Sequence, residues 1–351
     1  MNAIRVHQFT AAIGPRDAVS HHTFEVDTLL RDLGYETEIF AQHSHPDLRD
    51  RVHDYRLHAD LEADVLLYQA STGSRVGDYV LTRTEPLIVN YHNLTPAEMF
   101  DPWEPHVGAE LDAGRRQLGR LARKALRGLA DSHFNAAELE AAGLGDVVVA
   151  PVLFDPPPLR RSASIDVGEP PTVLFVGRLS PNKCQEDLIA ATAALREWIP
   201  DVRLELVGGT SSHRYETALR EHAQRVCPGG VEFAGSVSET QLADLYAHAD
   251  VFLCLSEHEG FCVPVIEAMA AGTPVVAFAA AVLPETIGNA GILLEDKSPT
   301  NVAVALERVL TDRELRAWLV EKGRARAATF SPERNRAIMR EALRAAVEVC
   351  V

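Results

Sequence analysis

The chain has 351 residues, with 50 acidic and 34 basic side chains and a formal net charge of −16 at pH 7. This length favours two domains, and the charge argues against nucleic acid as the main partner. No apolar run approaches the ~18 residues of a membrane span, the first residues lack a signal-peptide core, and the five cysteines lack metal-ligand spacing, so we expect a cytoplasmic protein with reduced thiols.

Short apolar runs alternate with amphipathic stretches along the first half, which is the pattern of a parallel sheet flanked by helices. The predicted strands are Ile4–Phe9, Glu36–Phe40, Val65–Tyr68, Leu87–Tyr91, Leu129–Phe134 and Val147–Ala150. The predicted helices include His21–Leu33 and Gly114–Leu129. Ligands of such sheets gather at the carboxyl ends of the strands.

A proline-rich segment, residues 156–171, predicts a stiff and extended linker. A second alternating series follows it. Its predicted strands are Thr172–Val176, Arg203–Val207, Val231–Ala234, Val251–Leu255, Pro274–Phe278 and Gly291–Leu294. Its predicted helices are Cys184–Trp198, His213–Val226, Thr240–His248, Pro264–Ala271, Thr300–Leu310 and Asp312–Thr329. We therefore predict an α/β protein with two Rossmann-like parallel-sheet domains, 1–155 and 172–331, that face each other across a cleft, and a last helix within 332–351.

Two glutamates with seven residues between them mark the start of a helix in the second half. Glu259 lies in the loop after the buried strand Val251–Leu255, and Glu267 lies about one turn inside the helix that begins near Pro264. The N-terminus of a helix favours an anion, and carboxylates beside it accept hydrogen bonds from hydroxyl groups. This combination predicts a sugar nucleotide as the ligand.

Two cations follow the first strand of the second half. That strand ends at Gly177, and Arg178 and Lys183 come after it. Arginine as a fork donor and lysine as a point charge together suit a diphosphate. Lys183 is one of only four lysines, which makes its position informative, although a solvated loop with two incidental charges is the alternative.

The segment from Ser256 to Ala277 resembles the Glu-x7-Glu signature of retaining glycosyltransferases of family 4, which have the GT-B fold. The likeness rests on the glutamate spacing, on Gly260-Phe261, on the run that begins at Glu267, and on Gly272-Thr-Pro-Val-Val. Arg178 and Lys183 match the pair that binds the donor diphosphate in that family. The resemblance implies that Glu259 holds the transferred sugar and that Glu267 holds the ribose. It also implies that the last helix, within 332–351, returns to the first domain.

The same resemblance implies further contacts. Besides Glu267, the donor side would include Gly177, Gly208, Val237, Gly260, Phe261, Cys262 and Val263. His92, at the end of a strand in the first half, would contact the donor sugar or the acceptor, and the acceptor side would include Gly14, Asp17, His21 and Ser132. The loop after the first strand has a single Gly14 where the family has a glycine pair, which leaves the acceptor open. The family needs no metal or other cofactor, and the 14 histidines lack ligand spacing.

The implied activity is transfer of a hexose from GDP-mannose or a UDP-hexose to a hydroxyl-bearing acceptor: a sugar, a lipid-linked glycan or a small molecule. Glycan, glycolipid or cell-envelope polysaccharide synthesis would be its setting. A nucleotide-sugar epimerase or hydrolase on the same fold, and a non-catalytic nucleotide-sugar-binding subunit, remain alternatives. The basic stretch Arg115–Arg127 resembles a helix that docks some family members on the inner face of the membrane; a solvated face on a core-packed helix is the other interpretation.

Overall fold

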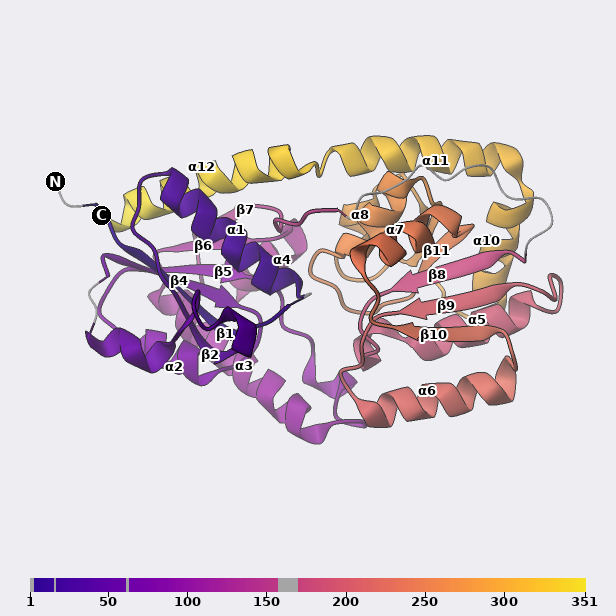
Figure 1. Cartoon of the computed structure of the whole chain (residues 1–351), viewed down its shortest axis with the longest axis horizontal. Helices are drawn as coiled ribbons and strands as arrows, with labels where there is room; N and C mark the ends of the chain where they lie inside the picture. The colour runs from indigo at the N-terminus through magenta and orange to yellow at the C-terminus, as the bar shows by residue number, and fades with distance from the viewer. Residues whose placement is uncertain (1–2, 16, 61–62, 157–169) are drawn as a thin grey trace. The chain divides into compact units, whose positions relative to one another are not determined.

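The computed structural model describes residues 3–15, 17–60, 63–156 and 170–351 (Figure 1). The chain divides into two compact units. Unit 1 comprises Met1–Asp101, Pro105–Asp155 and Ser331–Val351, and unit 2 comprises Pro102–Glu104 and Pro156–Phe330. Most of the predicted linker, residues 157–169, lies outside the described residues.

Unit 1 contains a seven-stranded parallel sheet with the order β3-β2-β1-β4-β5-β6-β7. The strands are β1 (Val6–Ile13), β2 (Ile39–Ser44), β3 (His53–Asp54), β4 (Val65–Ala70), β5 (Leu87–Tyr91), β6 (Arg127–Ala130) and β7 (Val147–Val149). The helices are α1 (Ala18–Asp32), α2 (Arg75–Thr82), α3 (Pro105–Lys124), α4 (His133–Ala141) and α12 (Pro332–Cys350), with short 3-10 turns at Pro46–Leu48, Tyr55–Asp60 and Ala97–Met99.

Both faces of this sheet are buried, as expected for parallel strands. Side chains alternate along β4, so Leu66 and Tyr68 join one apolar cluster while Val65 and Leu67 join another. Helices α2 and α3 supply the first cluster, and α1 and α12 supply the second. The near-continuous apolar runs of the sequence are therefore explained by burial on two sides.

The last helix, α12, is part of unit 1 although unit 2 precedes it in the chain. One stripe of the helix is fully buried against the sheet: Met339, Ala342, Leu343, Ala346 and Val347. Arg336 pairs with Glu25 of α1, and Arg340 Nη2 lies 3.1 Å from Asp32 Oδ2. Exposed ion pairs contribute little, so the apolar stripe supplies most of the stabilisation.

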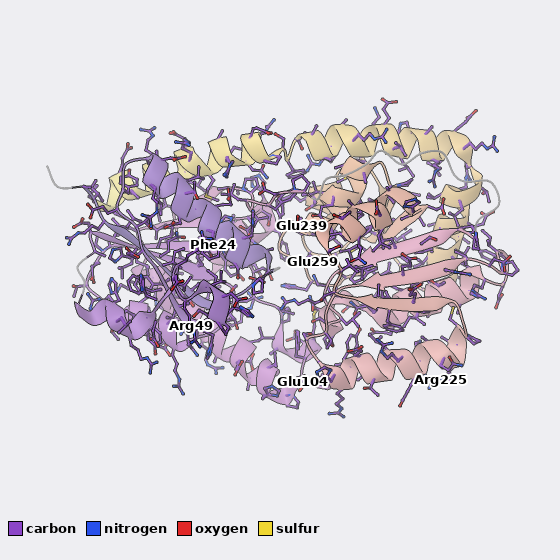
Figure 2. All side chains as sticks on the ribbon, in the orientation of Figure 1. Phe24, Arg49, Glu104, Arg225, Glu239 and Glu259 are labelled. Atoms are coloured by element: carbon purple, nitrogen blue, oxygen red, sulfur yellow. The ribbon has the colours of Figure 1, made fainter. Side chains whose placement is uncertain are left out.

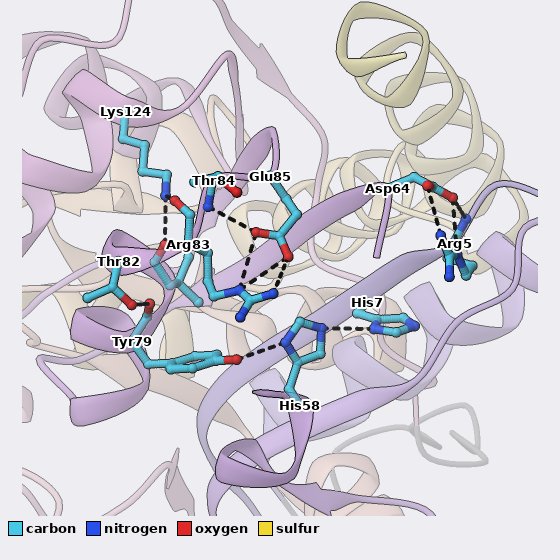
Figure 3. Close-up of polar contacts among 11 residues, drawn as sticks. Arg5, His7, His58, Asp64, Tyr79, Thr82, Arg83, Thr84, Glu85 and Lys124 are labelled. Atoms are coloured by element: carbon cyan, nitrogen blue, oxygen red, sulfur yellow. Dashed lines mark hydrogen bonds and ion pairs between the residues drawn. The ribbon is translucent and has the colours of Figure 1, made fainter. Parts of the chain in front are cut away.

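The predicted basic helix has different bounds and largely internal partners. Helix α3 ends at Lys124, and Arg127 lies in strand β6. The Lys124 ammonium donates to the carbonyls of Val80, at 2.9 Å, and of Arg83 at the end of α2, where a cation is favoured (Figure 3). Arg120 pairs with Asp78 at 2.7 Å. Much of the predicted basic face thus serves packing within unit 1.

A buried polar chain lies nearby and is also drawn in Figure 3. His58 contacts Tyr79 Oη through Nδ1 at 2.9 Å and His7 Nδ1 through Nε2 at 3.1 Å. Burial, together with the neighbouring His58, lowers the pKa of His7 to about 4. Burial therefore favours the neutral form of both histidines in the core of unit 1.

Unit 2 contains a six-stranded parallel sheet with the order β10-β9-β8-β11-β12-β13. The strands are β8 (Thr172–Val176), β9 (Arg203–Val207), β10 (Val231–Gly235), β11 (Val251–Cys254), β12 (Val275–Phe278) and β13 (Ile292–Leu294). The helices are α5 (Gln185–Leu195), α6 (His213–Val226), α7 (Glu239–His248), α8 (Val263–Ala271), α9 (Leu283–Ile287), α10 (Pro299–Thr311) and α11 (Arg313–Ala328), and Pro181–Lys183 forms the 3-10 turn η4.

Three predicted elements of the first half have wrong bounds. The predicted strand Glu36–Phe40 overlaps β2 only at Ile39 and Phe40. The predicted helix Gly114–Leu129 begins nine residues too late and ends five residues too late, because Pro105 opens α3 in the first turn, where proline is tolerated. The predicted strand Leu129–Phe134 is shifted, because Arg127–Ala130 pairs with β5 and β7 while Ser132 caps α4.

The first domain is also not continuous from residue 1 to 155. Residues 102–104 belong to unit 2. The ring of Trp103 packs edge-on against Tyr215 with centroids 4.9 Å apart, and Ser212 Oγ donates to Glu104 Oε1 at 2.6 Å. A single aromatic residue in a loop has no periodic pattern around it, so the sequence could not predict that Trp103 packs against Tyr215.

Candidate functional site

The strand order of each sheet reverses at one point, and ligands of such sheets bind at the carboxyl ends of the strands there. In unit 2 the reversal lies between β8 and β11, which pair in parallel. Arg178 and Lys183 follow β8, and Glu259 follows β11 (Figure 2). The topology thus brings together cations and a carboxylate that are far apart in sequence.

Lys183 and Glu259 form a close ion pair. The Lys183 Nζ lies 2.5 Å from Glu259 Oε2, and the Glu259 side chain is only 9% exposed. Burial on its own would lower the pKa of Lys183, but the charge of Glu259, helped by two nearby thiols, outweighs burial and holds that pKa above its ordinary value. The pair is therefore a charged one, and each partner neutralises the other in a largely dry setting.

Hydrogen bonds between the two loops fix this geometry. Asn182 Nδ2 donates to the carbonyl of His258 at 3.0 Å, and the Glu257 amide donates to the carbonyl of Asn182 at 3.0 Å. Lys183 ends the turn η4, and the next residue, Cys184, has the left-handed φ of 51° that redirects the chain into α5. The lysine is therefore positioned by backbone, while Arg178 next to Gly177 is exposed.

Glu267 lies in α8, and its Oε2 accepts a hydrogen bond from Tyr246 Oη at 2.7 Å. Burial raises the pKa of Glu267 to about 7, against the opposing hydrogen bond from Tyr246. The two glutamates thus differ in kind, because Glu259 is paired with a cation and Glu267 with a neutral hydroxyl. Tyr246, on α7, is a member of the site that the sequence did not reveal.

The predicted glycines have structural reasons to be glycine. At Gly208, φ is 139°, and an added Cβ would lie 2.2 Å from the carbonyl oxygen of Gly177. The end of β9 therefore meets the end of β8 backbone to backbone. Gly177 itself donates its N–H to Val207 O at 2.8 Å. Both glycines shape the edge of the sheet on which Arg178 is placed.

The remaining predicted donor-side residues surround the start of α8 or α7. Phe261 turns its ring onto Phe330 at 5.6 Å between centroids, and its carbonyl accepts from Thr286 Oγ1 at 2.8 Å. Gly260 adjoins it, Cys262 precedes the helix, and Val263 is its first residue. Val237 precedes Ser238, the N-cap of α7, and is half-buried. The Phe261 side chain is thus part of the packing.

In unit 1, His92 follows β5 and is almost fully buried against Asp131, with Nδ1 2.9 Å from Asp131 Oδ2. Its Nε2 lies 2.7 Å from Gln69 Oε1. Gln69 Nε2 donates to Gln8 Oε1 at 2.9 Å, and Gln8 Nε2 donates to the carbonyl of Thr23 at 3.2 Å.

This chain fixes the protons on His92. A carbonyl only accepts, so Gln8 must point its amide nitrogen at Thr23, and each later amide is oriented in turn. Gln69 therefore presents oxygen to His92 Nε2, which must donate, while Nδ1 faces the Asp131 carboxylate. Both ring nitrogens of His92 are thus engaged, which suits a positioning role better than that of a base.

The other residues predicted on the acceptor side are partly explained by local structure. Asp17 caps α1 by accepting from the Ser20 amide at 2.9 Å, and Ser132 caps α4 by accepting from the Asn135 amide at 3.1 Å. The Gly14 amide donates to Ser20 Oγ at 3.0 Å, and His21 Nε2 lies 3.7 Å from Asp155 Oδ2. These residues lie at the carboxyl edge of the sheet, as expected, but most of them hold helix starts.

The sequence missed a cavity of about 640 Å³ at the same edge of unit 1. It lies over the ends of β1 and β2 and beside α2 and α3, and its polar lining includes Gln42, His43, Ser74, Arg75, Asp78 and Arg120. The reversal of strand order in this sheet, between β1 and β4, is the signal that could have located it.

Two groups of potential metal ligands occur among the described residues. Cys254, Glu259 and Cys262 are buried together, and His21, Glu25 and Asp155 lie nearer the surface, each set with ligand atoms within 4.8 Å of one another. In each group a carboxylate already has a cation, Lys183 for Glu259 and Arg336 for Glu25. Neither group therefore offers a full set of ligands.

Comparison with known proteins agrees with this geometry. Residues 160–326 match the family described as "Glycosyl transferases group 1". A D-inositol 3-phosphate glycosyltransferase of Salinispora arenicola is 36% identical over 172 residues, which cover 46% of this chain and 38% of the relative. The match to this family covers just under half of the chain, and there the chain is similar to glycosyltransferases of this group. The predicted family is thereby confirmed.

A second relative is the GDP-mannose-dependent alpha-(1-6)-phosphatidylinositol monomannoside mannosyltransferase of Mycobacterium tuberculosis, 32% identical over 184 residues, which cover 49% of this chain and 47% of the relative. The match thus spans less than half the length of either relative. Sucrose-phosphate synthase from Thermosynechococcus elongatus superposes with a TM-score of 0.78 at 20% identity, over 98% of this chain and 99% of that one. This likeness, with the two parallel sheets, confirms the predicted GT-B fold.

Proposed function

We propose that this glycosyltransferase moves a hexose, with retention of configuration, from a nucleoside diphosphate sugar to a hydroxyl acceptor. The observation that carries the proposal is the 2.5 Å pair of Lys183 and Glu259 at the reversal point of the unit 2 sheet. Arg178 is exposed on one side of this pair, and Glu267 is buried in the following helix. Cations for a diphosphate thus adjoin carboxylates for hydroxyl groups.

Donor binding would exchange partners within this site. Diphosphate oxygens compete with Glu259 for the Lys183 ammonium, and Arg178 supplies a second, bidentate donor. Glu259, released from the lysine, can then accept hydrogen bonds from the hydroxyl groups of the transferred sugar. Before the donor binds, Lys183 and Glu259 neutralise each other. After it binds, the diphosphate replaces Glu259 as the partner of Lys183, and the sugar hydroxyl groups replace Lys183 as the partner of Glu259.

Glu267 would hold the ribose. Ribose hydroxyl groups donate hydrogen bonds and favour an ionised acceptor, whereas burial raises the pKa of Glu267 to about 7. Tyr246 already donates to Oε2 at 2.7 Å. Near neutral pH, nucleotide binding would therefore draw this carboxyl into its ionised form.

The reaction needs stabilisation of the departing diphosphate more than it needs a base. Arg178 and Lys183 would meet the negative charge that develops on the leaving oxygen, which is commonly a large part of the barrier reduction. The donor phosphate would take the acceptor proton on the same face. His92, with both nitrogens engaged, would keep the acceptor side of unit 1 in shape.

GDP-mannose is the leading donor and a UDP-hexose is the second. The mannosyltransferase from Mycobacterium tuberculosis, as its name states, uses GDP-mannose. A hydroxyl-rich acceptor would suit the unit 1 cavity, where Arg75 and Arg120 also allow an anionic group. We place the activity in glycan, glycolipid or cell-envelope polysaccharide synthesis. No described helix has the length and apolar character needed to cross a bilayer, and the internal contacts of α3 make membrane docking the less favoured role for it.

A thermal-shift screen with GDP, UDP and ADP tests the binding. The true ligand at 100 times its Kd should stabilise the protein by about 2.7 kcal/mol. Turnover of the matching sugar nucleotide, with and without hydroxyl acceptors, then tests the reaction, and NMR of the product reports the anomer. Free sugar released without acceptor would favour a hydrolase, and binding without turnover would favour a non-catalytic subunit.

A further inference from the structure

Two thiols lie at the two ends of the loop that carries Glu259. Cys254 ends strand β11, and Cys262 is the last residue before helix α8. Their sulfur atoms and a Glu259 carboxylate oxygen lie within 4.8 Å of one another, and all three residues are buried. The proposed transfer reaction uses neither thiol.

The two thiols are not equivalent. Cys262 donates a hydrogen bond to the sulfur of Cys254, which lowers the pKa of Cys254 although burial opposes this, and the same bond followed by burial raises the pKa of Cys262. Cys254 Sγ also lies 3.3 Å from Ser256 Oγ, which lowers the pKa of Cys254 further, while the Glu259 carboxylate opposes this. Of the two adjacent thiols, Cys254 is thus the one that ionises more readily, and Cys262 stays protonated beside it.

The backbone at Cys262 adds an independent observation. Its φ of 66° and ψ of 64° lie in the left-handed region, and its side chain makes no capping hydrogen bond to α8. Residues other than glycine lose about 1–2 kcal/mol in that region. The backbone conformation at residue 262 therefore favours glycine, and the Cys262 side chain is not needed to cap helix α8.

We propose that Cys254 and Cys262 form a reversible disulfide on exposure to peroxide and that this bond switches the donor site off. The Cys254 thiolate attacks one oxygen of hydrogen peroxide, the O–O bond breaks, and a sulfenic acid and hydroxide form. The Cys262 thiol then attacks the Cys254 sulfur, and the hydroxyl leaves with the thiol proton as water. Two thiols lose two electrons and two protons in total, and one peroxide is reduced to two waters.

The consequence for the site follows from the loop. A disulfide needs sulfur atoms about 2.05 Å apart, so residues 255–261 would be closed into a ring that contains Glu259. The Glu259 loop is also bonded to Asn182, next to Lys183, through His258. Movement of the loop would therefore change the separation of Lys183 and Glu259, and this step of the proposal rests on the proposed function.

A soft metal is the competing occupant of the same group. The geometry favours the disulfide, because a cation would have to displace the Lys183 ammonium from its 2.5 Å contact with Glu259. Without that carboxylate, the described group supplies only two sulfur ligands. Zinc binding is therefore an outcome to be tested against the disulfide.

Peptide mapping of the full chain tests the bond without any assay of transfer. Reduced protein is treated with hydrogen peroxide, free thiols are blocked with N-ethylmaleimide, and a glutamate-specific protease cuts after Glu257 and Glu259. The Cys254 and Cys262 peptides should then stay linked, lose both labels, and separate after reduction with dithiothreitol. Cys227→Ser, at a buried thiol of α6's C-cap, is the matched control and should give the same link. Independent labelling of Cys254 and Cys262 after peroxide would overturn the proposal.

Calorimetry with GDP and UDP tests the switch. Peroxide should weaken binding of the preferred nucleotide by about tenfold or more, dithiothreitol should restore it, and Cys254→Ser, which lacks the thiol that peroxide attacks, should bind equally before and after peroxide. An unchanged Kd in wild-type protein that carries the mapped disulfide would overturn the switch. Reduced protein that binds neither nucleotide would overturn the proposed function and the switch with it, while the peptide map still decides the disulfide.

Incubation with zinc alone completes the test. Reduced wild-type protein should retain no stoichiometric zinc after gel filtration. Retention of one zinc per chain that is lost in both Cys254→Ala and Cys262→Ala would overturn the disulfide in favour of a metal site.

Discussion

Among the described residues, each sheet has a buried pair of polar side chains at its carboxyl edge, and the two pairs are held very differently. In unit 1, His92 and Asp131 are joined to Gln69 and then to Gln8 by hydrogen bonds that leave no ring nitrogen of His92 unoccupied. In unit 2, Lys183 and Glu259 depend chiefly on each other. The first arrangement resists exchange of partners, whereas the second permits it. The comparison fits a structural role for the unit 1 pair and the ligand-binding role that we propose for the unit 2 pair.

The largest effect is expected from breaking the fixed pair. Asp131→Ala would leave Nδ1 of the buried His92 ring without its partner and should lower the free energy of unfolding by about 3–5 kcal/mol, as expected when one partner of a buried pair is removed. Asp131→Asn should recover most of this loss, because the new amide can donate to a neutral His92 that still donates to Gln69. Denaturant unfolding of both variants measures the difference. Equal losses would show that the ring protons are not held as we infer.

Glu259→Gln breaks the exchangeable pair. The rate of transfer should fall by about 10²- to 10³-fold, because the amide cannot offer the charge that a site carboxylate supplies. The matched control is Glu257→Gln in the same loop, since Glu257 pairs with Lys297 at 2.6 Å instead. Initial rates at saturating donor test this, and similar rates for the two variants would contradict the role of Glu259.

Glu267, the second carboxylate of the unit 2 site, should make the stability of the protein depend on pH. The pKa of Glu267 is about 7 in the folded protein, above its ordinary value of 4.5. The folded state thus binds the extra proton between these values, and its stability falls as pH rises through that window. Wild type should therefore lose roughly 2–3 kcal/mol relative to Glu267→Gln between pH 4.5 and 8. Parallel pH profiles of both proteins would contradict the raised pKa.

The smallest effect is expected from chelation. Both ion pairs are built from side chains alone, so the rate of transfer should be unchanged after incubation with EDTA and gel filtration. A rate that falls on chelation and returns with manganese or magnesium would show that a metal shares the work assigned to Arg178 and Lys183.

The sequence predicted the sheets well, because burial on both faces makes parallel strands apolar along their whole length. It failed where short runs were ambiguous. The apolar residues of 126–130 suit a helix or a strand, and only pairing with β5 and β7, which are distant in sequence, decides between them.

The candidate site likewise contains some residues that the sequence could predict and others that it could not. Glu259 and Lys183 could be expected to lie together because each is in the loop that follows a strand, and the strand order makes those strand ends neighbours. Tyr246 and the partners of His92 could not be predicted, because they reach the site from other elements through tertiary contacts. Asp17 and Ser132 were placed at the correct edge, but they serve as helix caps, which a sequence pattern does not distinguish from ligand contacts.

The most direct test of the central claim is calorimetric titration of Lys183→Ala with the nucleoside diphosphate and with the nucleoside. If Lys183 exchanges Glu259 for the diphosphate, this variant should bind the diphosphate about 1.5–3 kcal/mol more weakly, as expected for a charged hydrogen bond, and bind the nucleoside as wild type does. Lys297→Ala, which removes the ion pairs to Asp187 and Glu257, should leave both affinities unchanged. Equal loss for the two ligands, or no loss for either, would contradict the account.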